Sequence, residues 1–179
     1  MKQRMCSLFL ALVLLLSLAL PTAAAGTLPF TDVKESDWFY SYVKTMYDNE
    51  LVSGTTPTTF SPQDTVTLGE ALKFILNAAG YTAPTTSGKN WASGYYQLAQ
   101  EKGFLNSSWS LGLNDAMNRL QIAELIVNVL GVERKQQTAS PFTDTSDVAA
   151  LILSDHGIFE GTTERDGKTY FYPQRNISR

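Results

Sequence analysis

Two arginines occupy positions in the sequence that suit them to bind an anion. Arg119 and Arg179 each follow a residue that can cap a helix, Asn118 and Ser178. A guanidinium presents paired, planar donors that match a carboxylate, and a helix N-terminus adds positive potential. The two positions therefore indicate anion binding. For Arg119 the alternative is an ion pair with Asp115 or another acid that only orders the loop.

Two of the three tryptophans could contribute to binding through their aromatic faces. Trp38 and Trp91 could stack on sugar rings. Both have apolar neighbours at helical spacing, however, and this pattern favours places in the core, with a partly exposed edge possible. Trp109 lies in a less regular segment, where a core plug and an exposed aromatic remain equally open.

Catalytic groups are poorly marked in the sequence. His156 is the only histidine, and it falls at the expected end of a helix. Asp32, Glu35 and Asp37 are close in sequence, but such a cluster more plausibly caps a helix or holds a loop. No carboxylate pair is marked for glycoside hydrolysis. We therefore expect a protein that is not an enzyme and has no cofactor or metal site.

The first 25 residues predict a secretory signal peptide. Lys2 and Arg4 precede an apolar run over residues 6–20, and small residues at 23–25 suit cleavage before Gly26. The run is short for a membrane span. A retained anchor is the weaker alternative.

The mature chain that cleavage would leave is acidic and free of cysteine. Removing Lys2 and Arg4 from 14 basic residues, against 17 acidic ones, leaves a formal charge of −5. This balance gives no reason to expect nucleic acid or an anionic bilayer as a partner. Loss of Cys6 excludes disulfides, a cysteine nucleophile and thiolate metal ligands.

The elements that position the arginines recur along the chain. Three short segments of a first unit are repeated in a third unit: residues 30–32 at 142–144, residues 51–55 at 158–162, and residues 60–62 at 171–173. Residues 66–68 align with 117–119 and 177–179, so a second unit lies between them.

Each unit is predicted to contain a helix, a loop and a longer helix. In the first unit Thr67 and Glu70 form a capping box, and Gly80 ends the long helix. Asn118 and Gln121 are the corresponding pair in the second unit, where the helix ends at Gly131.

The shorter first helices carry weaker signals. Asp37 or Ser36 is expected to cap the first, with Trp38 facing inward, and the third is expected over residues 148–153. Gly54 is expected to permit a sharp turn in the loop that follows the first helix.

The units resemble S-layer homology repeats, the modules that hold secreted bacterial proteins on the cell wall. The motifs that carry this resemblance are Phe30-Thr31-Asp32-Val33 with Trp38, a glycine-bounded turn, Phe60-Ser61-Pro62, and the capped start of the long helix.

The resemblance implies an all-α fold of helix-loop-helix repeats in a pseudo-threefold bundle. The signal peptide would cover residues 1–25 and the domain residues 26–179. The repeats would cover residues 30–81, 88–132 and 141–179, and the third would be truncated. We expect the chain to be a fragment of a larger parent protein.

The resemblance also implies a function. The chain would be a non-catalytic anchor at the cell wall or S-layer of a secreted protein. Grooves between repeats would bind secondary cell-wall polysaccharide, often through a pyruvylated sugar. The family's arginine falls on Leu68, Arg119 and Arg179, so the first groove would lack its cation and bind weakly or only pack. The candidate ligand-binding residues are Arg119, Arg179, Trp38, Trp91, Asp32, Gly54 and Gly161.

Two other functions remain open. Exposed faces of an incomplete bundle could make the chain an assembly module, completed by another chain or by a second copy of itself. Less favoured is a part in an extracellular hydrolase that acts on the wall.

Overall fold

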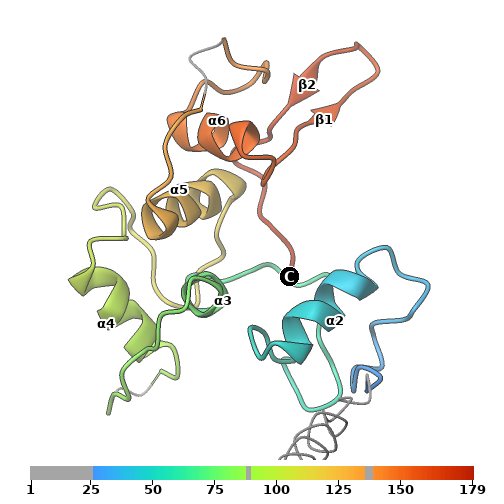
Figure 1. Cartoon of the computed structure of the whole chain (residues 1–179), viewed down its shortest axis with the longest axis vertical. Coiled ribbons are helices and arrows are strands. Elements are labelled where there is room, and N and C mark those ends of the chain that lie inside the picture. Colours follow the sequence, from blue (N-terminus) through green and yellow to red (C-terminus); the bar gives the residue numbers. More distant parts are fainter. Residues whose placement is uncertain (1–25, 88–89, 136–138) are drawn as a thin grey trace, which may run out of the picture.

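The computed structural model describes residues 26–87, 90–135 and 139–179. The predicted signal peptide and the predicted first residue of the second unit, residue 88, lie outside these ranges. The described chain is mostly helical, with a small two-stranded sheet near its C-terminal end (Figure 1).

Two long helices begin at the predicted capping boxes. Helix α3 covers Leu68–Ala78, and the Thr67 side chain accepts the Glu70 N–H while the Glu70 carboxylate accepts the Thr67 N–H. Helix α5 covers Arg119–Leu130, with Asn118 and Gln121 in the same reciprocal arrangement. Each box satisfies two amide groups that a helix start leaves unpaired. Both predicted helix starts are confirmed.

Three shorter helices precede or follow these. Helix α2 covers Tyr40–Asp48, α4 covers Ser93–Glu101, and α6 covers Val148–Asp155. The expectation that Asp37 or Ser36 caps α2 is wrong. The Asp37 carboxylate instead accepts the Lys34 N–H at 2.8 Å, and the helix starts after Phe39.

A short hairpin departs from the all-α prediction. Strand β1 (Thr162–Thr163) pairs antiparallel with β2 (Thr169–Tyr170). Gly167 has a φ of +76°, a conformation that glycine adopts without steric cost, and lies in the turn between the strands. The hairpin follows the loop glycine of the third unit, in a threonine-rich segment whose strand signal the helical repeat pattern obscured.

The three units meet in a ring of backbone hydrogen bonds. The Val66 N–H donates to the Ile177 carbonyl at 2.8 Å, the Ile177 N–H to the Met117 carbonyl at 3.3 Å, and the Met117 N–H to the Val66 carbonyl at 2.9 Å. Each of these residues lies just before a capping residue, where the extended backbone has no partner within its own unit. In this ring, the backbone N–H and carbonyl groups of one unit are hydrogen-bonded to those of the other two units.

Apolar side chains pack into three clusters around this ring. The largest joins α3, α4 and α5 through buried residues such as Leu72, Ala99 and Leu125. A second joins α5 to α6, and a third closes the first unit around Phe30 and Val43. Figure 1 shows α3 near the middle, with the C-terminal segment returning beside it.

None of the helices in the described ranges is long and apolar enough to cross a membrane.

Candidate functional site

Arg179 ties the third unit to the first. Its Nε donates to the Phe60 carbonyl at 3.0 Å and its Nη2 to the Ser53 carbonyl at 2.8 Å, while its Nη1 pairs with the Glu70 carboxylate. The guanidinium lies over the Phe60 and Phe74 rings, 4.9 and 5.2 Å from their centroids. Only 3% of the side chain is exposed. The Arg179 side chain is thus buried between the two units, and its Nε, Nη1 and Nη2 each donate a hydrogen bond.

A cavity of about 340 Å³ opens beside this arginine. It is lined by Ser53, Gly54, Thr55, Glu70, Lys73, Phe74, Trp91 and Arg179. The lining comes from the first unit's loop, from α3, from the start of the second unit and from the end of the third. A ligand here would touch all three units.

Lys73 and Trp91 give the cavity a half-buried cation and an exposed aromatic face. The Lys73 ammonium lies 5.9 Å from the Trp91 ring centroid and donates to Ser53 Oγ at 2.7 Å. Burial, followed by the charge of Arg179, lowers the Lys73 pKa below its ordinary value of 10.5. Trp91 is 60% exposed. An ammonium beside an open indole face suits an acidic sugar.

Gly54 lets two chain segments approach closely in the cavity wall. A Cβ at this position would lie 2.4 Å from the Thr56 and Thr59 carbonyl oxygens and 2.6 Å from the Phe30 ring. Gly161 in the third unit repeats the feature, with a Cβ 2.8 Å from Phe142. Glycine is required at both positions because any side chain would collide with the neighbouring segment.

Arg119 occupies a similar but less saturated position. Its Nη2 donates to the Glu160 carbonyl at 2.6 Å, and its guanidinium lies 4.8 Å from the centroids of both Phe159 and Phe171. Its Nε is buried and has no hydrogen-bond partner in the described part of the chain. Burial, then the charge of Arg175, lowers its pKa.

The alternative role for Arg119, an ion pair with Asp115 or another acid, is absent from the described residues. Asp115 accepts the Gly112 N–H at 2.7 Å instead. Arg119 therefore retains donors at Nη1 that an anion could use, whereas each nitrogen of the Arg179 guanidinium already donates a hydrogen bond.

Asp32 acts on the backbone of its own unit. Its two carboxylate oxygens accept the N–H groups of Phe60 and Ser61 at 2.8 and 2.7 Å. Burial alone would raise its pKa, but these backbone bonds prevail and lower it below 3.8. Asp144 makes the same pair of bonds in the third unit, to Phe171 and Tyr172.

The interpretation of Trp38 and Trp91 as core residues is wrong. Trp38 is 83% exposed and contacts Phe39 and Tyr42 edge to face. It precedes α2, so the helical spacing used to place it inside does not apply to it. Ala92, the neighbour of Trp91, is the residue that is buried.

The seven predicted ligand-binding residues fall into three groups. Arg179, Gly54 and Trp91 line one cavity. Arg119 of the second unit reaches the third unit at the Glu160 carbonyl, next to Gly161. Asp32 and Trp38 line neither place. Lys73 was missed, although it lies one helical turn after Glu70 and this spacing could have placed both on one face.

Side chains that could hold a metal ion do not gather in the described ranges. There, no three His, Cys, Asp or Glu side chains lie close enough to hold a metal ion. His156 follows α6 as its C-terminal cap, and its Nε2 lies 3.0 Å from the Glu133 carbonyl.

Comparisons with known proteins agree with the repeat motifs. The family model described as the S-layer homology domain matches residues 29–72. An endoglucanase of Bacillus sp. (strain KSM-635) is 32% identical over 97% of the chain and 20% of its own length. The middle cell wall protein of Brevibacillus brevis is 35% identical over 60% of the chain and 10% of its own length.

A third relative is the surface-layer 125 kDa protein of Lysinibacillus sphaericus, 28% identical over 82% of the chain and 13% of its own length. The chain thus spans a fifth or less of the length of these curated relatives.

Proposed function

The chain carries an S-layer homology domain and belongs to the secreted proteins of the bacterial cell surface, and from this premise we propose that it is a non-catalytic module that anchors a protein to the cell wall. Its ligand would be secondary cell-wall polysaccharide, bound in grooves between repeats.

We propose that the three units form a pseudo-threefold bundle, with repeats over residues 30–81, 88–132 and 141–179. The cyclic order of the backbone bonds among Val66, Met117 and Ile177 supports this arrangement. So does the exchange of arginines, because Arg179 contacts the first unit as Arg119 contacts the third.

The observation that carries the binding proposal is the cavity beside Arg179. Trp91 offers an open face for the C–H groups of a sugar ring, and Lys73 supplies a positive charge within reach of the same ligand. Together they suit a sugar that bears a carboxylate, such as the pyruvylated sugar implied by the family. Arg179 would act by holding the wall of the cavity, and Lys73 and Trp91 by direct contact.

Sedimentation with purified walls tests this proposal. Wall binding should be lost when the secondary polysaccharide is removed, and Lys73→Ala should weaken binding at least tenfold. Lys44→Ala, which removes an ammonium on α2 that pairs with Asp48, is the matched control and should bind normally. Because the Lys73 pKa is lowered, its ammonium loses its charge earlier as the pH is raised. Wall binding should therefore be lost at a lower pH than it would be with an unperturbed lysine. Equal binding to stripped and intact walls would contradict the proposal.

We assign Arg119 to a second anionic subsite. Its guanidinium makes one hydrogen bond in the described part of the chain, from Nη2 to the Glu160 carbonyl, so its Nη1 is left as a donor for a ligand. Arg119→Ala should weaken wall binding several-fold with only a small loss of melting temperature. Arg179→Ala should cost about 2–4 kcal/mol of stability, because it leaves Glu70 and two carbonyls without their partner. A larger stability loss for Arg119→Ala than for Arg179→Ala would make Arg119 structural.

Two alternatives remain as weaker proposals. The exposed Trp38 and Tyr42, at 83% and 66%, favour an assembly module that pairs with another chain. Light scattering of the secreted chain tests for assembly, since a clean monomer argues against it.

The second alternative is a part in an extracellular hydrolase, which the relative named as an endoglucanase keeps open. Turnover of wall polymers by the chain alone would support it.

A further inference from the structure

We propose that the pocket beside Leu68 binds an uncharged sugar residue. This inference rests on the proposed carbohydrate binding and extends it to the position where the cation is missing. Leu68 follows Thr67 as Arg179 follows Ser178, and its side chain is 2% exposed. It faces the second unit, and a cavity of about 350 Å³ lies there.

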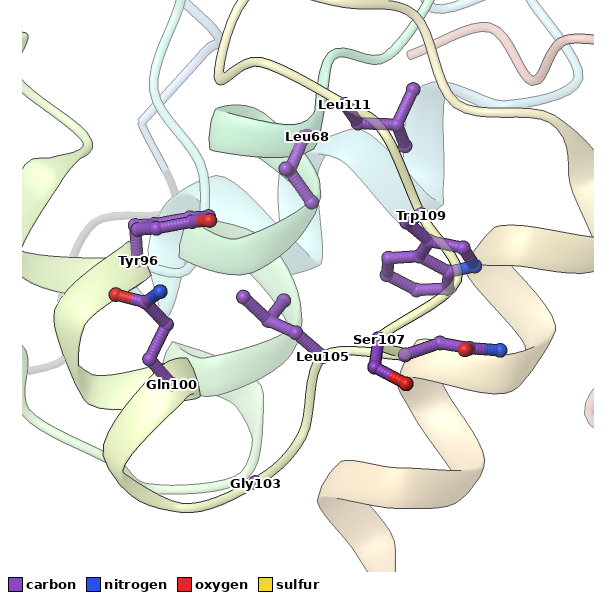
Figure 2. A pocket seen from close by; sticks show the side chains of 9 residues that line it. Leu68, Tyr96, Gln100, Gly103, Leu105, Ser107, Trp109 and Leu111 are labelled. Carbon is purple, nitrogen blue, oxygen red and sulfur yellow. The ribbon is translucent and has the colours of Figure 1, made fainter.

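The pocket combines aromatic, apolar and polar surfaces. Figure 2 shows Tyr96 and Gln100 on one side and Trp109 on the other, with Leu68 and Leu105 between them. Tyr96 and Trp109 both line the pocket and are half-buried, so part of each residue remains accessible. A sugar ring has C–H faces that pack on aromatic rings and hydroxyl groups that need polar partners.

Three polar side chains of the lining remain available. Within the described ranges, the side chains of Tyr96, Gln100 and Ser107 make no hydrogen bond, and Gln100 and Ser107 are exposed. They offer hydroxyl and amide groups that can both donate and accept, as sugar hydroxyls require.

The Trp109 side of the pocket is held in place by a carboxylate. Glu124 accepts the Trp109 indole N–H at 2.9 Å and the Asn106 amide N–H at 3.2 Å. The side-chain oxygen Oδ1 of Asn106 in turn accepts from the N–H and the hydroxyl of Ser108. Trp109 is therefore a fixed platform, and its orientation does not depend on a ligand.

Charge separates this pocket from the one beside Arg179. None of its lining residues is a cation, and the Glu124 carboxylate lies directly behind Trp109 and Asn106. A negative group at the wall of a cavity without a compensating cation disfavours an acidic ligand. The cavity beside Arg179 would thus bind an acidic sugar of the polymer, and the pocket beside Leu68 a neutral sugar of the same polymer.

Trp109 provides a local signal for the test. The chain has three tryptophans, Trp38, Trp91 and Trp109, so an ¹H–¹⁵N spectrum contains three indole N–H signals, and Trp109→Phe identifies the third. The secreted chain beginning at Gly26 would be titrated with the methyl β-glycosides of glucose, galactose, N-acetylglucosamine and N-acetylmannosamine. The pyruvate ketal of the last is the charged comparison.

At least one neutral glycoside should shift the Trp109 signal at millimolar concentration, and the charged glycoside should shift it at least tenfold less readily. Gln100→Ala should weaken the neutral response about tenfold. Gln97→Ala is the matched control, since its amide bonds Glu101 on the same helix outside the pocket, and it should respond normally. Leu68→Arg should reverse the preference toward the charged glycoside.

The inference is overturned if no neutral glycoside moves the Trp109 signal, or if the charged one moves it as readily. Wall sedimentation keeps this outcome apart from the proposed function. If Lys73→Ala loses wall binding but no glycoside shifts the Trp109 signal, the proposal of wall anchoring is supported and only the proposal of a neutral-sugar pocket fails. If a neutral glycoside shifts the Trp109 signal but wall binding is unchanged by removal of the polysaccharide, the pocket proposal is supported and the proposed anchoring function fails.

Discussion

At the scale of single residues, Asp32 holds a strained turn in its loop. Ser61, whose N–H it accepts, has a φ of +60°, and Tyr172, held by Asp144, has a φ of +58°. A residue other than glycine pays about 1–2 kcal/mol for this conformation. Two charge-assisted backbone hydrogen bonds offset that cost. The aspartate of the opening motif therefore stabilises the positive φ of the middle residue of the Phe-x-Pro motif.

The first prediction follows from this clamp. Asp32→Ala should lower the free energy of unfolding by about 2–4 kcal/mol, because two backbone donors lose a charged acceptor. Urea denaturation measures the loss, with the exposed carboxylate variant Glu35→Gln as the control. The clamp should work only while Asp32 is ionised. Its pKa is below 3.8, so its contribution is complete above that pH and is lost as the pH falls through the lowered value. A variant as stable as the parent at pH 7 would contradict the clamp.

At the scale of elements, the loops and helix ends use glycine for different reasons. Gly80 and Gly131, behind α3 and α5, have φ values of +80° and +62° and open space where a Cβ would lie. Gly54 has no such backbone requirement, but a side chain there would collide with two carbonyl oxygens. Helix ends thus need glycine for conformation, and the cavity wall needs it for space.

These reasons predict different costs. Gly80→Ala should lower stability by about 1 kcal/mol, the penalty of a left-handed alanine. Gly54→Ala should lower it by about 3 kcal/mol or more, because backbone atoms of Thr56 and Thr59 must move. It should also weaken wall binding, since Gly54 lines the Arg179 cavity. Thermal unfolding of both variants checks the order, and equal losses would contradict it.

At the scale of the whole molecule, the ring of backbone bonds makes each unit depend on the others. Val66, Met117 and Ile177 each donate to one unit and accept from another. The core around α3, α4 and α5 also contains side chains from more than one unit. We expect the units to unfold together.

A single substitution tests this cooperativity. Ile177→Pro removes the donor to the Met117 carbonyl and should destabilise the whole chain by about 1–3 kcal/mol. Helix content and tryptophan fluorescence should still report one coincident transition. Separate transitions for the two signals would mean that the units fold independently.

Local patterns in the sequence were enough for the long helices. Thr67 with Glu70, and Asn118 with Gln121, satisfy helix amides within four residues, so their role follows from the chain alone. Gly80 and Gly131 are equally local. The start of α2 was mispredicted at Asp37 because its carboxylate had two possible backbone partners, and the opening loop took it.

The sequence by itself determined the capped starts of the two long helices and the matching positions of Leu68, Arg119 and Arg179 after Thr67, Asn118 and Ser178. The tertiary structure alone decided what those positions contact. Arg179 meets Ser53 and Glu70, more than a hundred residues away, and each of its guanidinium nitrogens donates a hydrogen bond. Arg119 makes a single such bond in the described part of the chain, and Leu68 borders a pocket whose lining carries no charge. The physical reason is that a side chain's charge and reach are local properties, but the partners that satisfy it are supplied by a neighbouring unit.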